Sequence, residues 1–180
     1  MKKLIFSAAV FLFISVTAFA QTEKGDWLVG GNITLNTAKN NTAIGLTPNA
    51  GMFILNNLAF GGNFSIVYTN QGSAKTTNFG IGPFARYYFS TAAVRPFLQA
   101  SAGFLSTKVT ADSASSSTNG LNYFLGVGAA YFINENISIE AVAGYDHTKY
   151  KDFDGTSGFL LKIGFQVYLN QRQVQNVRGK

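Results

Sequence analysis

The chain has 180 residues, of which 47% are hydrophobic and 14% aromatic, with 19 glycines, three prolines and no cysteine. Because cysteine is absent, the chain holds neither a disulfide scaffold nor a lipid anchor attached to cysteine. The formal net charge of +6 comes partly from basic residues near the two ends, and no basic surface laced with aromatic residues accompanies it. Nucleic acid is therefore not an expected partner.

Residues 1–20 have the features of a secretory signal peptide. Two lysines precede an apolar run over residues 4–19, and Ala18-Phe19-Ala20 forms a small-x-small cleavage pattern. The alternative, a transmembrane anchor, is disfavoured because the run is short and no stop-transfer charges follow it. We therefore predict export. After cleavage, about 160 residues remain, which is the length of one domain.

From Trp27 onward, apolar residues alternate with small or polar residues, which is the period of a strand with two unlike faces. Eight segments show this alternation. We predict a strand over residues 27–35, 44–52, 58–68, 78–89, 95–104, 121–133, 137–145 and 159–169. Pro48 lies inside the second segment, where a proline removes a ladder hydrogen bond, so we expect a β-bulge there.

Two kinds of connection alternate between these segments. Tight turns are predicted at residues 55–57, 90–94 and 134–136, and polar loops at residues 36–42, 69–77, 107–120 and 147–157. The Ser-rich stretch 107–120 is expected to be the longest loop and to be mobile. An even number of strands, with turns and loops in alternation and both termini at the turn end, indicates a closed up-and-down barrel.

The apolar stripes of these strands indicate a membrane rather than a soluble core. The strands are long, and Tyr123, Tyr131 and Tyr145 lie near the ends of the stripe, as interfacial aromatics do. In hydrocarbon only a closed barrel leaves no unpaired edge. A soluble lipocalin-like barrel is the alternative, but the polar faces carry mostly Gly, Ser, Asn and Ala with few charges. The predicted fold is all-β: an eight-stranded antiparallel up-and-down transmembrane β-barrel.

The signal peptide, the Gly-x-Gly and aromatic-ended strands, and the turn over residues 53–58 (Phe-Ile-Leu-Asn-Asn-Leu) resemble those of the small outer-membrane β-barrel family, also called porin-family proteins. The resemblance covers about the whole mature chain. It implies a barrel domain over residues 21–169 in the outer membrane of a Gram-negative cell envelope. It also implies contact with outer-membrane lipid and lipopolysaccharide, and insertion by the barrel-assembly machinery. Such barrels commonly end at an aromatic residue of the last strand, whereas here a polar basic tail follows at residues 170–180.

Several charged side chains are predicted to face the barrel interior. Arg86, Glu140 and Lys162 each stand between residues of the lipid-facing stripe, so they point inward. The interior of an eight-stranded barrel is just wide enough for side chains to fill. We therefore predict an ionic cluster of these three residues that holds the lumen shut, with Arg86 as the better partner of Glu140 because barrel shear separates Glu140 from Lys162. The alternative is a small pore or gated channel for small solutes.

A barrel-embedded lipid-modifying hydrolase is a more remote alternative. His147 is the only histidine, and Asp146 and Ser157 are near it in the sequence, so composition alone permits a Ser-His-Asp set. No serine lies two residues from His147 on the same strand face, as a resemblance to the barrel deacylases would require. Asp152 and Asp154 add possible metal ligands without a recognised spacing. We expect no catalytic residue, metal or cofactor, and a structural or surface-interaction role in which loops meet an extracellular partner.

Overall fold

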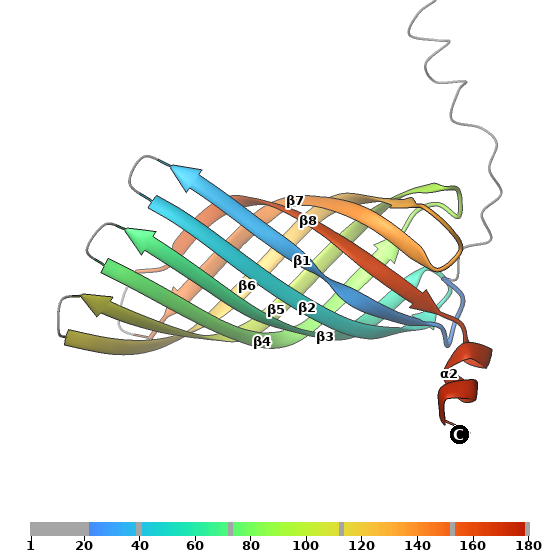
Figure 1. Ribbon diagram of the computed structural model, residues 1–180, viewed down its shortest axis with the longest axis horizontal. Helices are drawn as coiled ribbons and strands as arrows, with labels where there is room; N and C mark the ends of the chain where they lie inside the picture. Colours follow the sequence, from blue (N-terminus) through green and yellow to red (C-terminus); the bar gives the residue numbers. More distant parts are fainter. Residues whose placement is uncertain (1–21, 39–40, 72–73, 112–113, 152–153, 179–180) are drawn as a thin grey trace, which may run out of the picture.

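The computed structural model describes residues 22–38, 41–71, 74–111, 114–151 and 154–178. The predicted signal peptide at residues 1–20 lies outside these residues. Eight strands form a closed antiparallel barrel in which each strand pairs with its sequence neighbours and the first pairs with the last (Figure 1). The strands are β1 (Trp27–Ala38), β2 (Asn41–Leu55), β3 (Leu58–Gln71), β4 (Ala74–Tyr88), β5 (Val94–Ala111), β6 (Ala114–Phe132), β7 (Ile137–Tyr150) and β8 (Thr156–Leu169). The predicted fold class is confirmed.

The period-two pattern sorts the side chains of each strand into two environments. On β7, Ile137, Ile139 and Ala141 are exposed on the outer surface, while Ser138 and Glu140 between them are buried inside. The same rule places large apolar side chains on the outside of every strand; Phe104, Val127, Phe159, Leu161 and Ile163 are among the most exposed. The outer surface is therefore an apolar band, and the polar residues are enclosed.

The predicted polar loops are much shorter than the sequence suggested, because the strands run on. Residues 107–111 belong to β5 and residues 114–120 to β6, with a continuous register from Thr107↔Thr118 to Ala111↔Ala114. The prediction of a long loop over residues 107–120 is thus wrong. Beyond the apolar band this hairpin has no apolar surface to face, so its sequence loses the alternation on which the strand predictions rested, while Ser and Thr still pair in the ladder. The other three loops shorten in the same way.

The expected bulge at Pro48 is also wrong. Pro48 pairs in register with Gly31 of β1, and the β2–β3 register is the same on its two sides, at Leu46↔Ile66 and Asn49↔Asn63. The missing N–H of proline removes one bond, but the neighbouring pairs hold the register. The one shift in this ladder lies between Phe53 and Leu55, beside the tight turn.

The strands are staggered around the barrel. Following cross-strand partners from Tyr168 of β8 once around leads back to β8 at Gly158, nearer the loop end. The path runs through Tyr168, Leu28, Gly51, Gly61, Phe84, Ser101, Phe124, Asp146 and Gly158. This stagger is the shear of the barrel. Side chains at one depth of the interior therefore come from different rows of the ladder, so ladder partners are not the residues that meet across the bore.

Both ends of the described chain pack at the turn end, the end that carries the tight turns. Residues 171–178 of the predicted tail form helix α2 (Gln171–Arg178), shown in red in Figure 1. Asn170 and Gln173 cap it reciprocally: the Gln173 N–H donates to Asn170 Oδ1 at 2.8 Å and the Asn170 N–H donates to Gln173 Oε1 at 2.9 Å. Gln171 Nε2 donates to the carbonyl oxygen of Lys24 at 2.8 Å, which ties the helix to the segment before β1. Among the described residues, no helix is long and apolar enough to cross a membrane.

Candidate functional site

A buried ion pair joins opposite walls of the barrel. Arg86 on β4 donates from Nη1 to Glu140 Oε2 at 2.7 Å and from Nη2 to Glu140 Oε1 at 3.0 Å, while Glu140 lies on β7. Both residues are only 1% exposed. The two parallel bonds give the bidentate geometry that makes Arg–carboxylate pairs strong and directional.

The remaining donors of Arg86 are used as well. Nε and Nη2 donate to Gln99 Oε1 at 3.0 Å and 2.6 Å, and Nη1 also donates to the hydroxyl of Tyr88 at 3.1 Å. All five N–H groups of the guanidinium therefore have an acceptor. Gln166 Nε2 donates a further bond to Glu140 Oε1 at 3.0 Å. A buried network with its charged members paired is stable, whereas removing one partner would leave a buried charge uncompensated.

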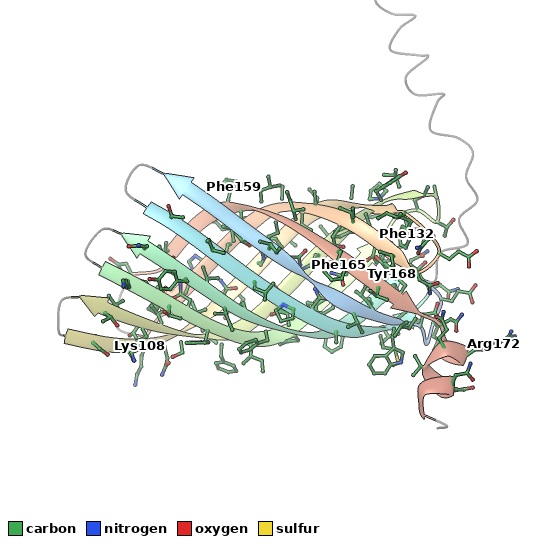
Figure 2. All side chains as sticks on the ribbon, in the orientation of Figure 1. Lys108, Phe132, Phe159, Phe165, Tyr168 and Arg172 are labelled. Atoms are coloured by element: carbon green, nitrogen blue, oxygen red, sulfur yellow. The ribbon has the colours of Figure 1, made fainter. Side chains whose placement is uncertain are left out.

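Aromatic rings lie between this network and the turn end. The hydroxyls of Tyr88 and Tyr168 share a hydrogen bond of 2.8 Å, and the ring of Phe53 lies 6.0 Å from that of Tyr88 and 6.4 Å from that of Tyr168. Phe132 packs on Tyr168 with ring centroids 4.7 Å apart, and both side chains lie near the turn end in Figure 2. The ring of Phe97 lies 4.4 Å below the Arg86 guanidinium carbon. Packed rings and the ion pair thus lie together in this half of the interior.

The mouth at the turn end is covered by the segment that precedes β1. Thr22, 3% exposed, donates from Oγ1 to Asn57 Oδ1 at 2.7 Å, and its carbonyl accepts from the Asn57 N–H at 2.8 Å. Arg95 is fully buried there: Nη1 donates to Thr22 Oγ1 at 2.8 Å, and its guanidinium carbon lies 4.4 Å above the Phe132 ring. The sequence analysis missed this cover, because residues 22–26 show no strand or helix pattern.

Lys162 lies apart from the ion pair. Its ladder partner on β7 is Val142, and its ammonium nitrogen stands 3.7 Å above the centre of the Phe124 ring. Within the described part of the chain, the one ion pair within 4.0 Å is Arg86 with Glu140. The structure thus brings together two of the three residues of the predicted cluster and places the third nearer the loop end, which follows from the stagger of the strands.

The half of the interior nearer the loop end is polar and less completely bonded. Asn122 donates to Asp146 Oδ2 at 2.9 Å and to Thr148 Oγ1 at 3.0 Å. The side-chain oxygens of Asn32 and Asn49 are buried and have no hydrogen-bond partner. The side-chain oxygen of Gln166, nearer the turn end, is likewise buried without a partner. Gly126, Gly144 and Gly164 also face the interior here, and the Phe124 ring lies against the first two and the Asn32 side chain against the third. This half therefore differs from the other in its hydrogen bonding.

The hydrolase alternative finds only part of its machinery. His147 Nδ1 and Ser157 Oγ are 2.8 Å apart in a hydrogen bond between β7 and β8, so His147 is in a strand and not in the predicted loop. Asp146 points to the opposite face, where it accepts from Asn122, and does not orient the imidazole. The described residues contain no group of three acidic, His or Cys side chains suited to a metal ion. Asp152 lies outside the described residues.

Comparisons with known proteins agree with this architecture. A family model described as outer membrane protein beta-barrel domain matches residues 6–170. Neisserial surface protein A superposes with a TM-score of 0.63 at 18% identity, covering 79% of this chain and 94% of that one. The N-terminal β-barrel domain of OprF from Pseudomonas aeruginosa gives 0.53 at 14% identity, covering 83% and 100%. Ail, the attachment invasion locus protein of Yersinia pestis, gives 0.51 at 15% identity, covering 81% and 99%. No curated protein sequence matches the chain significantly.

Proposed function

Because the chain belongs to the outer membrane protein beta-barrel domain family and lies in the outer membrane, we propose that it is a closed, non-enzymatic barrel with a structural or surface-interaction role. In this proposal the turn end faces the periplasm and the loop end faces outward. The signal peptide is residues 1–20, the barrel domain residues 21–169 and the tail residues 170–180, and the barrel-assembly machinery inserts the mature chain.

The observation that carries the proposal is the ion pair of Arg86 and Glu140 with its surrounding bonds. A conducting path would have to pass this level, where a bidentate pair crosses the bore and every guanidinium N–H is occupied. Separating the pair to open the bore would leave two buried charges without partners. Loss of one partner alone costs about 3–5 kcal/mol. The rings of Phe53, Tyr88 and Tyr168 support the closure from the turn side.

Contact with other molecules is then left to the loop end. The β5–β6 hairpin extends beyond the apolar band as a paired ribbon, and Lys108 and Ser115 to Ser117 on it are exposed. Lys75, Lys149 and Lys151 are also exposed at this end. Ammonium groups just beyond an apolar band meet the phosphates of lipopolysaccharide, and the ribbon offers hydroxyl and ammonium donors to an extracellular partner.

Single-channel recording in planar bilayers tests closure. We expect purified protein to give no large, steady currents, and we expect Arg86→Ala and Glu140→Ala to raise the conductance. Lys108→Gln, which removes an exposed charge outside the bore, is the matched control and should behave as wild type. Large steady currents from the wild-type barrel would favour the second candidate function, a small pore. The polar, glycine-containing half of the interior nearer the loop end supports that alternative.

A further inference from the structure

The pairing of β1 with β8, here called the seam, closes the barrel without a covalent connection. Every other pair of neighbouring strands is consecutive in the chain, so a turn or loop holds its two members together. At the seam the first and last strands meet, and the entropic cost of bringing two segments together grows with the length of chain between them. At the turn end the seam begins with the pair Trp27↔Leu169. The ends of paired strands fray readily, so contacts outside the ladder decide how firmly this end stays closed.

The segment that leads into β1, residues 22–26, is fixed by bonds to the turn between β2 and β3. The Gly25 N–H donates to the carbonyl oxygen of Phe53 at 2.7 Å, and the Lys24 N–H donates to Asn56 Oδ1 at 3.0 Å. These bonds lie outside the β1–β8 ladder. The segment is therefore an anchor on the β1 side of the seam, to which a group from the β8 side can attach.

The first turn of α2 joins this anchor to the end of β8. Gln171 Nε2 donates to the carbonyl oxygen of Lys24 at 2.8 Å, and the backbone N–H of Gln171 lowers the pKa of the Asp26 carboxyl, against the rise that burial causes. Gly25 has a φ of 94°, in the left-handed region, and a Cβ at this position would collide with the side-chain amide of Gln171. Glycine therefore both allows the bend of the chain and leaves room for the tail.

The same helical turn is also held on the side of β7. Asn136, in the turn between β6 and β7, donates from Nδ2 to Gln173 Oε1 at 3.2 Å and to the carbonyl oxygen of Tyr168 at 2.7 Å. The Tyr168 N–H donates in return to the Asn136 carbonyl at 2.7 Å. Farther along the helix Gln175 is exposed, and the helix extends away from the barrel (Figure 1). The first turn of α2, through Gln171 and Gln173, thus bridges the ends of β7, β8 and β1.

We propose that the first turn of α2 and residues 22–26 form a clasp that holds β1 against β8 at the turn end. The clasp replaces the covalent turn that every other pair of neighbouring strands has, and it gives the polar tail a function in keeping the barrel closed. Releasing it opens the seam locally and leaves the ion pair of Arg86 and Glu140 intact, because that pair joins β4 and β7. The inference goes beyond the proposed surface role and is independent of it, since the clasp is expected whether or not the barrel conducts.

Amide hydrogen exchange of the isotope-labelled mature chain in lipid nanodiscs tests the clasp. Gln171→Glu keeps the size of the side chain but places an acceptor where the Lys24 carbonyl needs a donor. We expect the amides of residues 27–29 and 167–169 to exchange about tenfold faster than in wild type, while those of β4 and β5 keep their rates. Gln175→Glu adds the same charge at an exposed position of the same helix, so it is the matched control and should leave exchange at the seam unchanged.

Spin labels measure docking of the tail directly. Because the chain has no cysteine, Lys24→Cys with Gln175→Cys gives two unique labelling sites, and the Lys24 substitution retains the backbone carbonyl that Gln171 binds. Electron–electron double resonance should give a narrow distance distribution, which broadens when Gln171→Glu is added. Heat-modifiable migration in detergent gels verifies that each variant is folded. Equal exchange at the seam in Gln171→Glu and Gln175→Glu, faster exchange spread evenly around the barrel, or a broad distribution while Gln171 is intact would each overturn the proposal.

Discussion

The two halves of the barrel interior are built on different principles. Toward the turn end, charged and aromatic side chains such as Arg86, Glu140 and Tyr168 are buried and hydrogen-bonded to one another. Toward the loop end, Asn32 and Asn49 keep buried oxygens without a partner, and Lys162 rests on a ring. Both halves have polar residues on the inner face, so polarity alone does not distinguish them. The difference lies in whether the charged groups find a hydrogen-bonded partner of opposite charge, and it predicts where substitutions are costly.

The largest effect is expected at the ion pair. Glu140→Ala leaves the Arg86 guanidinium buried without its counter-charge and should lower the free energy of unfolding by about 3–5 kcal/mol. Urea-driven unfolding from lipid vesicles measures it. The double variant with Arg86→Ala removes the stranded charge and should regain part of the loss. Single variants as stable as wild type would mean that the two charges are separately hydrated and do not close the lumen.

A smaller loss is expected among the aromatic residues. Tyr168→Phe keeps the ring but removes the hydroxyl that bonds Tyr88 at 2.8 Å and Ser138 at 3.3 Å. The expected decrease in the free energy of unfolding is about 1–3 kcal/mol, because buried partners are left unsatisfied. Tyr145→Phe on the exposed outer face is the matched control and should change it far less. If both variants lose equal stability, the buried hydroxyl network has no special weight.

In the other half of the interior the expected effect is close to zero. Asn32→Ala removes a buried oxygen that has no partner, so the free energy of unfolding should change by less than about 1 kcal/mol. The same urea titration applies. A loss as large as that of Glu140→Ala would show that Asn32 contributes as much to stability as the ion pair, and that the two halves are equally bonded.

The smallest effect concerns pH dependence at the turn end, outside the membrane-spanning strands. Burial raises the pKa of Asp26, while the N–H of Glu23 donates to its carboxylate at 3.1 Å and opposes the shift. A raised folded-state pKa contributes stability below the unfolded value of about 3.9, and this contribution is lost as pH rises through the folded pKa. The free energy of unfolding of wild type should therefore fall relative to that of Asp26→Asn as pH rises from about 3.9 through the folded-state pKa. A constant difference between the two proteins across the range would contradict the shift.

The sequence predicts a strand here only where the two faces of that strand meet different environments, lipid on one side and the barrel interior on the other. Within the apolar band, alternation predicts each strand and the inward direction of Arg86, Glu140 and Lys162. Beyond the band both faces of a hairpin meet water, alternation disappears, and residues 107–120 look like a loop although they pair. The position of Lys162 and the cover made by Thr22 depend on barrel stagger and on contacts distant in sequence, which periodicity does not contain.

The ion pair also bears on how the barrel assembles. Arg86 and Glu140 are 54 residues apart on β4 and β7, and neither strand pairs with the other. In a sheet that has not yet closed into a barrel, the two side chains do not meet, and each unpaired charge is costly in a membrane. Only the completed cylinder brings them to 2.7 Å. The pair therefore favours the closed barrel over a sheet that is still open in the bilayer.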